Sequence, residues 1–494
     1  MKTRSLLSIQ PWAIWAICLF IVGAAVRLVN LNAPPLDFQP TRQLRNSLVA
    51  RSVYYDRQTD ADPRQRELAQ SFRRAVGQYE PPIFETIVGS TFGLTGGESF
   101  AIPRLYGTLF WLASGLALFA LCRRAASPAA SLISLAFYLL LPFGVQASRS
   151  FQPDPLMTAS FVIGMYFLYR WSEEQHWRWA ILAAVFAGFA VLVKIVIVFL
   201  VAGGAIALVL TALGRRFWRS AQVWTMVALM AAPASAYYLL AHPERSTEYF
   251  FAWTVELLRL ITSVHFYADW LGFVGSLVGL TLLFLSLAGT ALASPRFRWM
   301  LVGLWVGYFV YGLMLPFQMF THSYYHLQLV PVVALGLVGV AEALISAVTG
   351  LSRGWKLAAL LVLLAFAGYE AWAARSVLVA EDFSEAPQLW RGIGAAIPED
   401  ADVIALTQDY GFDLMYWGWR KVHLWPLNTA LSEARKDHRE LMARFTELTA
   451  GNEYFLVTAF GQLDSQPGLA EALAGYSVAA EGEGYILYDL NAPK

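Results

Sequence analysis

The chain has 494 residues, of which 57% are hydrophobic and only 14% are charged. A typical soluble protein carries about 25% charged residues, so this composition excludes an ordinary cytosolic enzyme, a disordered protein and a nucleic-acid binder that uses a basic patch. Lys and Arg number 36 against 35 for Asp and Glu, so net charge points to no partner. The 18 Trp residues fit a membrane protein, because amphipathic rings concentrate at bilayer interfaces. The composition therefore predicts a polytopic α-helical membrane protein.

Apolar segments long enough to cross a bilayer as helices, about 20 residues each, recur along the chain. We predict about eleven spans, at 11–28, 103–121, 129–147, 156–169, 179–193, 196–213, 221–241, 271–293, 299–315, 326–348 and 356–373. The fifth and sixth spans are separate only if the chain turns at Lys194, since one continuous helix would overshoot the membrane. Arg27, near the end of the first span, is expected to snorkel to the interface.

The distribution of basic residues predicts the orientation, because short cytoplasmic loops collect Lys and Arg. With the N-terminus inside, every short inner loop is basic, whereas the short outer turns hold only Arg149 and Lys194. This places the C-terminal region outside. Both cysteines, Cys18 and Cys122, lie in apolar runs, and the lack of a disulfide framework favours a bacterial inner membrane over the endoplasmic reticulum.

Two segments outside the spans are predicted to fold outside the hydrocarbon region. The first outer loop, 31–102, is predicted to contain interfacial helices at 43–55 and 64–76. Residues 375–494 are predicted to form a small α/β domain outside the membrane, with strands at 403–406, 454–457 and 484–490 and a helix at 431–448. The predicted domains are therefore 1–374, which includes the loop, and 375–494. Asp400-Ala401-Asp402 resembles a metal-binding triplet, but its place before a strand is typical of an ordinary turn.

Charged and polar residues gather at the predicted outer helix ends, where charges near the hydrocarbon region are costly and often functional. They are Asp37, Arg149, Gln152, Asp154, Lys194 and the segment Thr321-His322-Ser323-Tyr324-Tyr325-His326. Such a set suits transfer of a sugar from a lipid phosphate to a hydroxyl. The acceptor needs a general base such as Asp37, and the leaving phosphate needs cations such as Lys194, Arg42 and a histidine.

Each of these residues also has a purely structural interpretation. Asp37 could cap the helix that follows, Arg149 and Asp154 could form an interfacial ion pair of little energetic value, and Lys194 could snorkel. His322 and His326 are four residues apart, a spacing compatible with a metal. His is also common in the aromatic belt, so the sequence supports no metal site and predicts no required cofactor.

At these residues the sequence resembles the GT-C glycosyltransferases. The resemblance is carried by an Asp directly after the first span, two helices in the first outer loop, and four short segments in the expected order. These segments are Pro103-Arg104-Leu105-Tyr106-Gly107-Thr108, Ser148-Arg149-Ser150-Phe151-Gln152-Pro153-Asp154, Leu192-Val193-Lys194 and His322-Ser323-Tyr324-Tyr325-His326. The closest groups are the protein O-mannosyltransferase superfamily (glycosyltransferase family 39) and the aminoarabinose transferases that modify lipid A.

The resemblance implies a polyprenyl-phosphate sugar donor and transfer at the outer face to a lipid, glycan or protein acceptor, with no nucleic acid involved. Carried over by position, Asp37 is the catalytic carboxylate and Asp154 a second one. Donor-phosphate contacts fall to Lys194, Arg42 or Arg45, and to His322, Tyr325 and His326, while Arg149 and Gln152 are candidate substrate contacts. Many members have Glu after the first Asp, where this chain has Phe38 and Gln39, which weakens the case for a metal.

Two other functions remain open from the sequence. A transporter or lipid flippase would place its polar site near the bilayer midplane on broken helices, often in repeated halves, and the sequence shows no such repeat. A ligase that moves a whole glycan from its lipid carrier needs the same base and the same cations. Only identification of the substrate would distinguish the ligase from the glycosyltransferase.

Overall fold

The computed structural model describes residues 10–58, 60–77, 79–429, 432 and 441–494. The chain divides into two compact units. The helical unit comprises Met1–Leu31, Tyr79–Ile83 and Pro103–Ala380, and the sheet unit comprises Asn32–Gln78, Phe84–Ile102 and Glu381–Lys494. Most of the first outer loop is therefore compact with the residues that follow the last span, whereas the sequence placed this loop in the domain of the spans.

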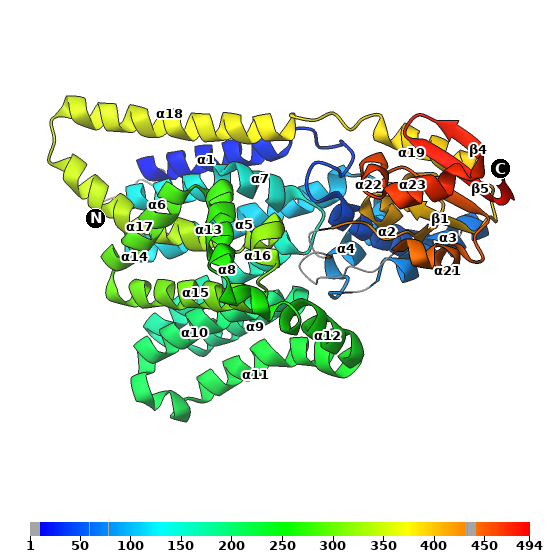
Figure 1. Cartoon of the computed structure of the whole chain (residues 1–494). Coiled ribbons are helices and arrows are strands. Elements are labelled where there is room, and N and C mark those ends of the chain that lie inside the picture. The colour runs from blue at the N-terminus through cyan, green and yellow to red at the C-terminus, as the bar shows by residue number, and fades with distance from the viewer. Residues whose placement is uncertain (1–9, 59, 78, 430–431, 433–440) are drawn as a thin grey trace. The chain divides into compact units, whose positions relative to one another are not determined.

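The helical unit consists of helices that follow the apolar segments in chain order (Figure 1). The α-helices are α1 (Pro11–Arg27), α5 (Ala101–Ala125), α6 (Pro128–Leu140), α7 (Pro142–Arg149), α8 (Asp154–Glu174), α9 (Trp177–Val193), α10 (Val198–Leu213), α11 (Ala221–Ser235), α12 (Pro243–Phe250), α13 (Val264–Val278), α14 (Leu280–Leu292), α15 (Pro295–Met314), α16 (Gln318–Thr321), α17 (Leu329–Thr349) and α18 (Arg353–Leu378). Short 3-10 or π turns join them at η1 (Ile195–Ile197), η2 (Gly214–Arg219), η3 (Ala236–Ala241), η4 (Phe251–Val255), η5 (Leu258–Thr262) and η6 (Ser323–His326).

Each predicted span coincides with at least one helix, but the helices differ in length. Among the described residues, six helical segments are long and apolar enough to cross a membrane, and the number rises to eight if each of two bent pairs is one span. The helices α1 and α9 are apolar but shorter. Figure 1 shows α18 running alongside α1, which it contacts through Ala374 and Leu378. The polytopic helical architecture is confirmed, and the number of eleven spans stays a prediction.

Two segments predicted as single spans are bent. The span at 129–147 bends by 56° between α6 and α7, and the span at 271–293 corresponds to α13 and α14, which meet at 95°. Pro142 opens α7 and has no N–H, so the preceding carbonyls need other donors. The Trp111 indole donates to the carbonyl of Tyr138 at 3.1 Å, and Arg27 Nη1 donates to that of Leu139 at 2.8 Å. At the second bend Gly279 adopts φ 82°, a conformation that favours glycine.

Glycines allow two helix pairs of this unit to pack backbone against backbone. A Cβ added to Gly203 would lie 2.1 Å from the carbonyl oxygen of Gly303, which brings α10 onto α15. A Cβ added to Gly289 would lie 2.0 Å from the carbonyl oxygen of Gly336, which brings α14 onto α17. Such small-residue contacts drive helix association where water supplies no hydrophobic force.

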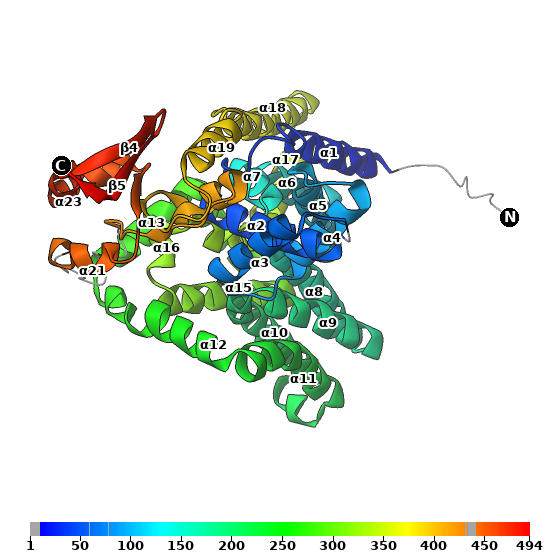
Figure 2. The same cartoon turned by 90° about the vertical axis from the view of Figure 1, so that its right-hand side faces the viewer.

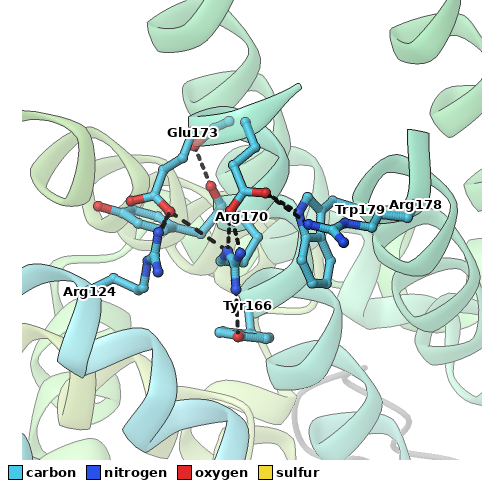
Figure 3. Close-up of polar contacts among 9 residues, drawn as sticks. Arg124, Tyr166, Arg170, Glu173, Arg178 and Trp179 are labelled. Atoms are coloured by element: carbon cyan, nitrogen blue, oxygen red, sulfur yellow. Dashed lines mark hydrogen bonds and ion pairs between the residues drawn. The ribbon is translucent and has the colours of Figure 1, made fainter. Parts of the chain in front are cut away.

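The C-terminal end of α8 carries a network of ion pairs, shown in Figure 3. Arg124 at the end of α5 contacts Glu173 at 2.5 Å, and Arg170 pairs with Glu174. The indole of Trp179 also donates to Glu174 at 2.7 Å, and the Arg170 guanidinium lies 4.3 Å from the centre of the Trp179 ring. Arg124 and Arg170, which belong to the basic loops predicted at the inner face, therefore also join α5, α8 and α9 to one another.

The sheet unit combines helices from the first loop with the C-terminal α/β segment. The helices are α2 (Pro40–Arg57), α3 (Pro63–Ala75), α4 (Ile83–Thr95), α19 (Ala386–Ala396), α21 (Phe445–Thr449), α22 (Phe460–Asp464) and α23 (Pro467–Ala474), with the turns η7 (Asp409–Gly411), η8 (Leu414–Gly418) and η9 (Leu441–Arg444). The strands are β1 (Val403–Leu406), β2 (His423–Leu424), β3 (Tyr454–Val457), β4 (Tyr476–Gly482) and β5 (Tyr485–Pro493), in the order β2-β1-β3-β5-β4.

Strand β1 pairs in parallel with β2 and β3, whereas β5 pairs antiparallel with β3 and β4, the two-stranded edge visible in Figure 2. The predicted strands at 403–406 and 454–457 are confirmed, and the predicted last strand appears as β5. The short edge strand β2 and the polar strand β4 were not predicted. Half of the predicted helix at 431–448 lies outside the described residues, and its last part forms η9 and the start of α21.

The two faces of this sheet have separate cores because side chains alternate along each strand. Val403 and Ala405 of β1 face a core that contains Leu44 and Leu48 of α2 and Phe72 of α3, together with α19 and η8. The other face packs against α22 and α23 through a second core of Ile404, Leu406, Trp425, Phe455, Val457, Leu469 and Leu473. The predicted loop helices α2 and α3 thus cover one face of the sheet.

Arg51 of α2 is the main polar contact inside the first of these cores. Its Nε lies 2.9 Å from Glu98 Oε1, its Nη1 donates to the carbonyl of Tyr416 at 2.5 Å, and its guanidinium stacks on the Tyr416 ring at 3.8 Å and on Trp419 at 4.5 Å. Arg51 is 5% exposed. One side chain therefore joins the loop helix α2, the segment that follows α4 and the C-terminal segment.

Replacing Gly336 with Ala should destabilise the helical unit, because the added Cβ would lie 2.0 Å from Ser286 Oγ and 2.6 Å from the Ser286 carbonyl oxygen. Overpacking of this kind costs about 1–3 kcal/mol, so the Tm of the purified full-length protein in detergent should fall. Gly368→Ala in α18 is the matched control, because nothing lies within 4 Å of its added Cβ. An equal Tm for both variants would contradict the packing account.

Candidate functional site

The predicted site residues divide between the two units. Asp37, Arg42 and Arg45 belong to the sheet unit. The others belong to the helical unit; they are Arg149, Gln152, Asp154, Lys194, His322, Tyr325 and His326. The two groups are described in turn.

Lys194 and Asp154 form a buried ion pair in the helical unit. Helix α9 ends at Val193, Lys194 is extended with φ −154°, and η1 begins at Ile195, so the predicted turn at Lys194 is confirmed. Lys194 Nζ donates to Asp154 Oδ1 at 2.8 Å, and the two residues are 3% and 1% exposed. The interpretation of Lys194 as a snorkelling residue is wrong, and Asp154 pairs with Lys194 rather than with Arg149.

Aromatic rings surround the ammonium group of Lys194. Its Nζ lies 4.7 Å from the centre of the Tyr324 ring and 4.5 Å from that of Tyr325, which is within cation–π range. The Tyr325 hydroxyl shares a 2.9 Å hydrogen bond with the hydroxyl of Tyr249, in α12. The sequence predicted Tyr325 near the donor phosphate, as it did Lys194, but it gave no role to Tyr249, which precedes the expected span at 271–293.

Buried polar atoms without hydrogen-bond partners lie at the start of α8. Asp154 Oδ2 has no partner, and neither has the oxygen or the nitrogen of the Gln152 amide, although Gln152 is fully buried. Buried polar groups are nearly always hydrogen-bonded, so such atoms need an explanation. Asp154 also opens α8, where backbone N–H groups favour negative charge. This end of the helical unit therefore has the capacity to bind a polar ligand.

The two histidines make local contacts. His326 is fully buried; its Nδ1 bonds to the hydroxyl of Tyr308 at 2.7 Å and its Nε2 to the carbonyl of Met319 at 3.1 Å. His322 Nδ1 lies 2.6 Å from the hydroxyl of Thr321. A phosphate contact from His326 would require one of its two bonds to break. Within the described residues, no group of three or more His, Cys, Asp or Glu side chains is placed to hold a metal ion.

Arg149, a predicted substrate contact, bonds to the backbone after α1. It donates to the carbonyls of Val29 and Asn30, and Arg104 donates to those of Asn30 and Leu31 at 3.0 Å each. Both arginines are 1% exposed. These bonds satisfy carbonyls that the end of α1 leaves without a helical partner. The contacts of Arg149 thus identify a structural role at the exit of the chain from α1.

Asp37 lies in the sheet unit just before α2. Its Oδ1 accepts a hydrogen bond from the Gln43 amide at 3.2 Å, and the same amide nitrogen donates to the carbonyl of Phe38 at 2.7 Å. The N-cap residue of α2 is Gln39, which has φ 50° and whose side chain makes no capping bond. Gln43 is fully buried, so it holds the Asp37 carboxylate from a fixed position.

The two candidate phosphate-binding arginines of α2 have different surroundings. Arg42 lies in the first turn and is half-buried. Arg45 is 4% exposed and lies 3.6 Å from the Glu85 carboxylate, and it donates to the Asn46 side chain at 2.8 Å and the Gly77 carbonyl at 3.0 Å. Arg45 is therefore held by contacts within its own unit.

The sequence gave no role to two carboxyl groups that follow β1. Asp409 Oδ1 accepts a hydrogen bond from the Thr41 hydroxyl in the first turn of α2. Asp413 is 2% exposed, and its Oδ2 has no hydrogen-bond partner. Burial, followed by the charge of Asp409, raises the pKa of Asp413 to about 8. Thr41 and Asp409 are 368 positions apart, so sequence spacing could not reveal this contact.

Asp413 should make the stability of the sheet unit depend on pH. Its pKa in the folded protein is about 8 against an ordinary 3.8, so the folded state loses stability as the pH rises from about 4 to about 8. Asp413→Asn should therefore raise the Tm of the full-length protein, and more at pH 8 than at about pH 5. Asp400→Asn is the control, because that side chain is 98% exposed. An equal gain for Asp413→Asn at both pH values would contradict this assignment.

The chain was compared with protein families and with curated proteins. Residues 79–239 match the family described as dolichyl-phosphate-mannose-protein mannosyltransferase. Over 207 residues the chain is 26% identical to the lipid A galacturonosyltransferase RgtD of Rhizobium johnstonii. That alignment covers 41% of this chain and 44% of RgtD, so the chain matches less than half of the length of this relative.

Solved structures resemble nearly the whole chain. ArnT from Cupriavidus metallidurans matches with a TM-score of 0.59 in its complex with undecaprenyl phosphate, at 14% identity over 96% of this chain and 97% of ArnT. The oligosaccharyltransferase AglB from Archaeoglobus fulgidus, with an inhibitory peptide and a dolichol-phosphate, matches with a TM-score of 0.52, at 14% identity over 94% of this chain and 73% of AglB. The chain therefore has the fold of the GT-C glycosyltransferases, as the resemblance in its sequence predicted.

Proposed function

We propose that the chain is an integral-membrane glycosyltransferase that moves a sugar from a polyprenyl phosphate to a hydroxyl group of a lipid, glycan or protein acceptor. The observation that carries the proposal is the buried Lys194–Asp154 pair, with aromatic rings around the ammonium group. A buried cation beside unpartnered polar atoms suits an anionic head group. The structures of ArnT with undecaprenyl phosphate and AglB with dolichol-phosphate support a lipid-phosphate donor for this fold.

In the proposed reaction, Asp37 acts as the general base. It takes the proton of the acceptor hydroxyl, whose oxygen attacks the anomeric carbon of the donor. The bond from that carbon to the phosphate oxygen breaks, and the polyprenyl phosphate leaves with the electron pair. Lys194 and Arg42 stabilise the charge that develops on the phosphate. Asp154 holds Lys194 in place, because a buried ammonium needs a close counter-charge.

The observed contacts narrow the roles of the other predicted residues. Arg45, Arg149 and His326 are engaged with a carboxylate, main-chain carbonyls and a tyrosine within their own units. We assign these three residues a structural role, in which each stabilises the part of the site that belongs to its own unit. Gln152 stays a candidate for binding substrate because its buried amide has no partner. We expect the reaction to need no metal or other cofactor, since a positioned base and two cations suffice for it.

The multi-pass helices place the protein in a membrane, and relatives from bacteria support the inner membrane. We propose transfer at the outer face, with a cytoplasmic N-terminus and the C-terminal segment in the periplasm. The two bent helix pairs do not support the transporter alternative, which requires broken helices with a polar site at the break. The bend at Gly279 lies among apolar residues, and at the other bend the free carbonyls of Tyr138 and Leu139 are satisfied by Trp111 and Arg27.

Replacing Asp37 with Asn should abolish transfer while the protein stays folded. General-base catalysis contributes about 10²–10⁴-fold, so the rate should fall by at least about 100-fold. The assay measures transfer of radiolabelled galacturonate or mannose from a defined polyprenyl-phosphate donor to a bacterial lipid extract by the purified full-length protein. Asp400→Asn, which alters an exposed carboxylate of the same unit, should keep full activity. Wild-type rates for Asp37→Asn would remove the assigned base.

The proposed orientation predicts which side of the membrane each surface faces. In a variant with both cysteines replaced, a single Cys at the exposed position Glu483 should react with a membrane-impermeant thiol reagent in cells with a permeabilised outer membrane. A single Cys at the exposed position Arg215 should react only after the inner membrane is lysed. Protection at Glu483 with labelling at Arg215 would reverse the assignment.

A further inference from the structure

The turn that follows β1 has an unusual backbone. Asp409, Tyr410 and Gly411 adopt φ values of 49°, 56° and 69°, so two residues other than glycine lie in the left-handed region. Each such residue costs on the order of 1–3 kcal/mol and persists only where its surroundings hold it. In this turn Gln408 Oε1 accepts from the Thr458 hydroxyl at 2.9 Å, and the same hydroxyl bonds to Thr407 at 2.8 Å. The turn is thus anchored to the ends of β1 and β3.

This anchored turn holds the start of α2. Asp409 accepts a hydrogen bond from the hydroxyl of Thr41, the second residue of α2. The first turn of a helix has backbone groups without helical partners, and the N-cap residue Gln39 supplies no side-chain cap. Gln39 itself has φ 50°. The contact between Thr41 and Asp409 therefore fixes a helix start that local capping leaves unsupported.

The same helical turn holds Asp37. Gln43, two residues after Thr41, donates from one amide nitrogen to Asp37 Oδ1 and to the carbonyl of Phe38. A shift of the α2 start would carry this amide with it and reorient the Asp37 carboxylate. Asp413 supports the arrangement, because it is buried beside Asp409 and its raised pKa keeps it protonated at neutral pH. Burial raises the pKa of Asp409 itself, and the hydrogen bond from Thr41 opposes that rise.

We propose that Asp409 is a positioning residue for the general base: through Thr41 it fixes the first turn of α2, and through Gln43 that turn sets the direction of the Asp37 carboxylate. The proposal rests on the proposed function, because it assumes that Asp37 is the base. It makes the C-terminal segment part of the catalytic apparatus. All contacts in this chain of residues lie within the sheet unit.

The test compares Thr41→Val, which removes only the hydroxyl, with Thr41→Ser, which keeps it. In the transfer assay with the full-length protein, Thr41→Val should lower kcat by about 10- to 100-fold, since small misplacements of a reacting group cost this much. KM for the polyprenyl-phosphate donor should stay within about twofold of the wild-type value. The Thr41→Ser variant, which keeps the hydroxyl, should have the wild-type kcat. Asp409→Asn should have a similar effect, and the double variant should be no worse than either single one, because both remove the same contact.

Thr449→Val is the matched control, because among the described residues its hydroxyl bonds within its own helix, to the carbonyl of Phe445 at 2.8 Å. It should leave kcat unchanged. Hydrogen exchange gives a readout without turnover: residues 38–43 should exchange faster in Thr41→Val than in Thr449→Val. Unchanged kcat and unchanged exchange in Thr41→Val, or a loss confined to KM or Tm, would overturn the proposal. If Asp37→Asn is inactive while Thr41→Val is fully active, only this inference fails; if Asp37→Asn is active, the assigned base fails with it.

Discussion

Main-chain carbonyls that lose their helical partners need other donors, and in the helical unit buried arginines supply them. Arg27 reaches the carbonyls of Gly23 and Leu139 and the hydroxyl of Ser148, across the bend before α7. Arg104 and Arg149 bind the three carbonyls that follow α1. All three arginines are at most 1% exposed. A guanidinium has five N–H donors in a rigid fork, so a lysine could not replace it, and the exit of the chain from α1 depends on these groups.

The sheet unit follows the same principle with different acceptors. Arg51 joins α2 to Glu98 and to the backbone of Tyr416, and Arg45 joins it to Glu85 and Gly77. These bonds, together with Leu44 and Leu48 in the core, make the first loop a layer of the C-terminal sheet. The residue proposed as base, Asp37, therefore lies just before a helix whose first turn is bonded to Asp409, 368 positions after Thr41 in the chain.

The sequence predicted those features of the fold that depend on residue composition and on the spacing of apolar residues along the chain. It identified the apolar segments, the break at Lys194, the two loop helices and three strands of the sheet. It could not predict that Asp154 meets Lys194, because that depends on the rotation of α8 and α9 about their axes. Arg149, Arg45 and Arg27 were predicted at a surface or at a ligand, since a sequence shows charges but not the carbonyls that a bend or a helix end exposes. Asp409 received no role for the same reason, as its partner Thr41 lies in a distant segment.

The sheet unit is built from two parts of the chain that the ribosome makes at different times. Its first part, up to Ile102, is synthesised before the helical segment Pro103–Ala380, and its remaining part only afterwards. At about 5–20 residues per second, the ribosome needs on the order of half a minute to make the intervening segment. During that time Leu44, Leu48 and Phe72 lack the strands that bury them. The core that these three side chains join can therefore form only after the C-terminal strands have been made.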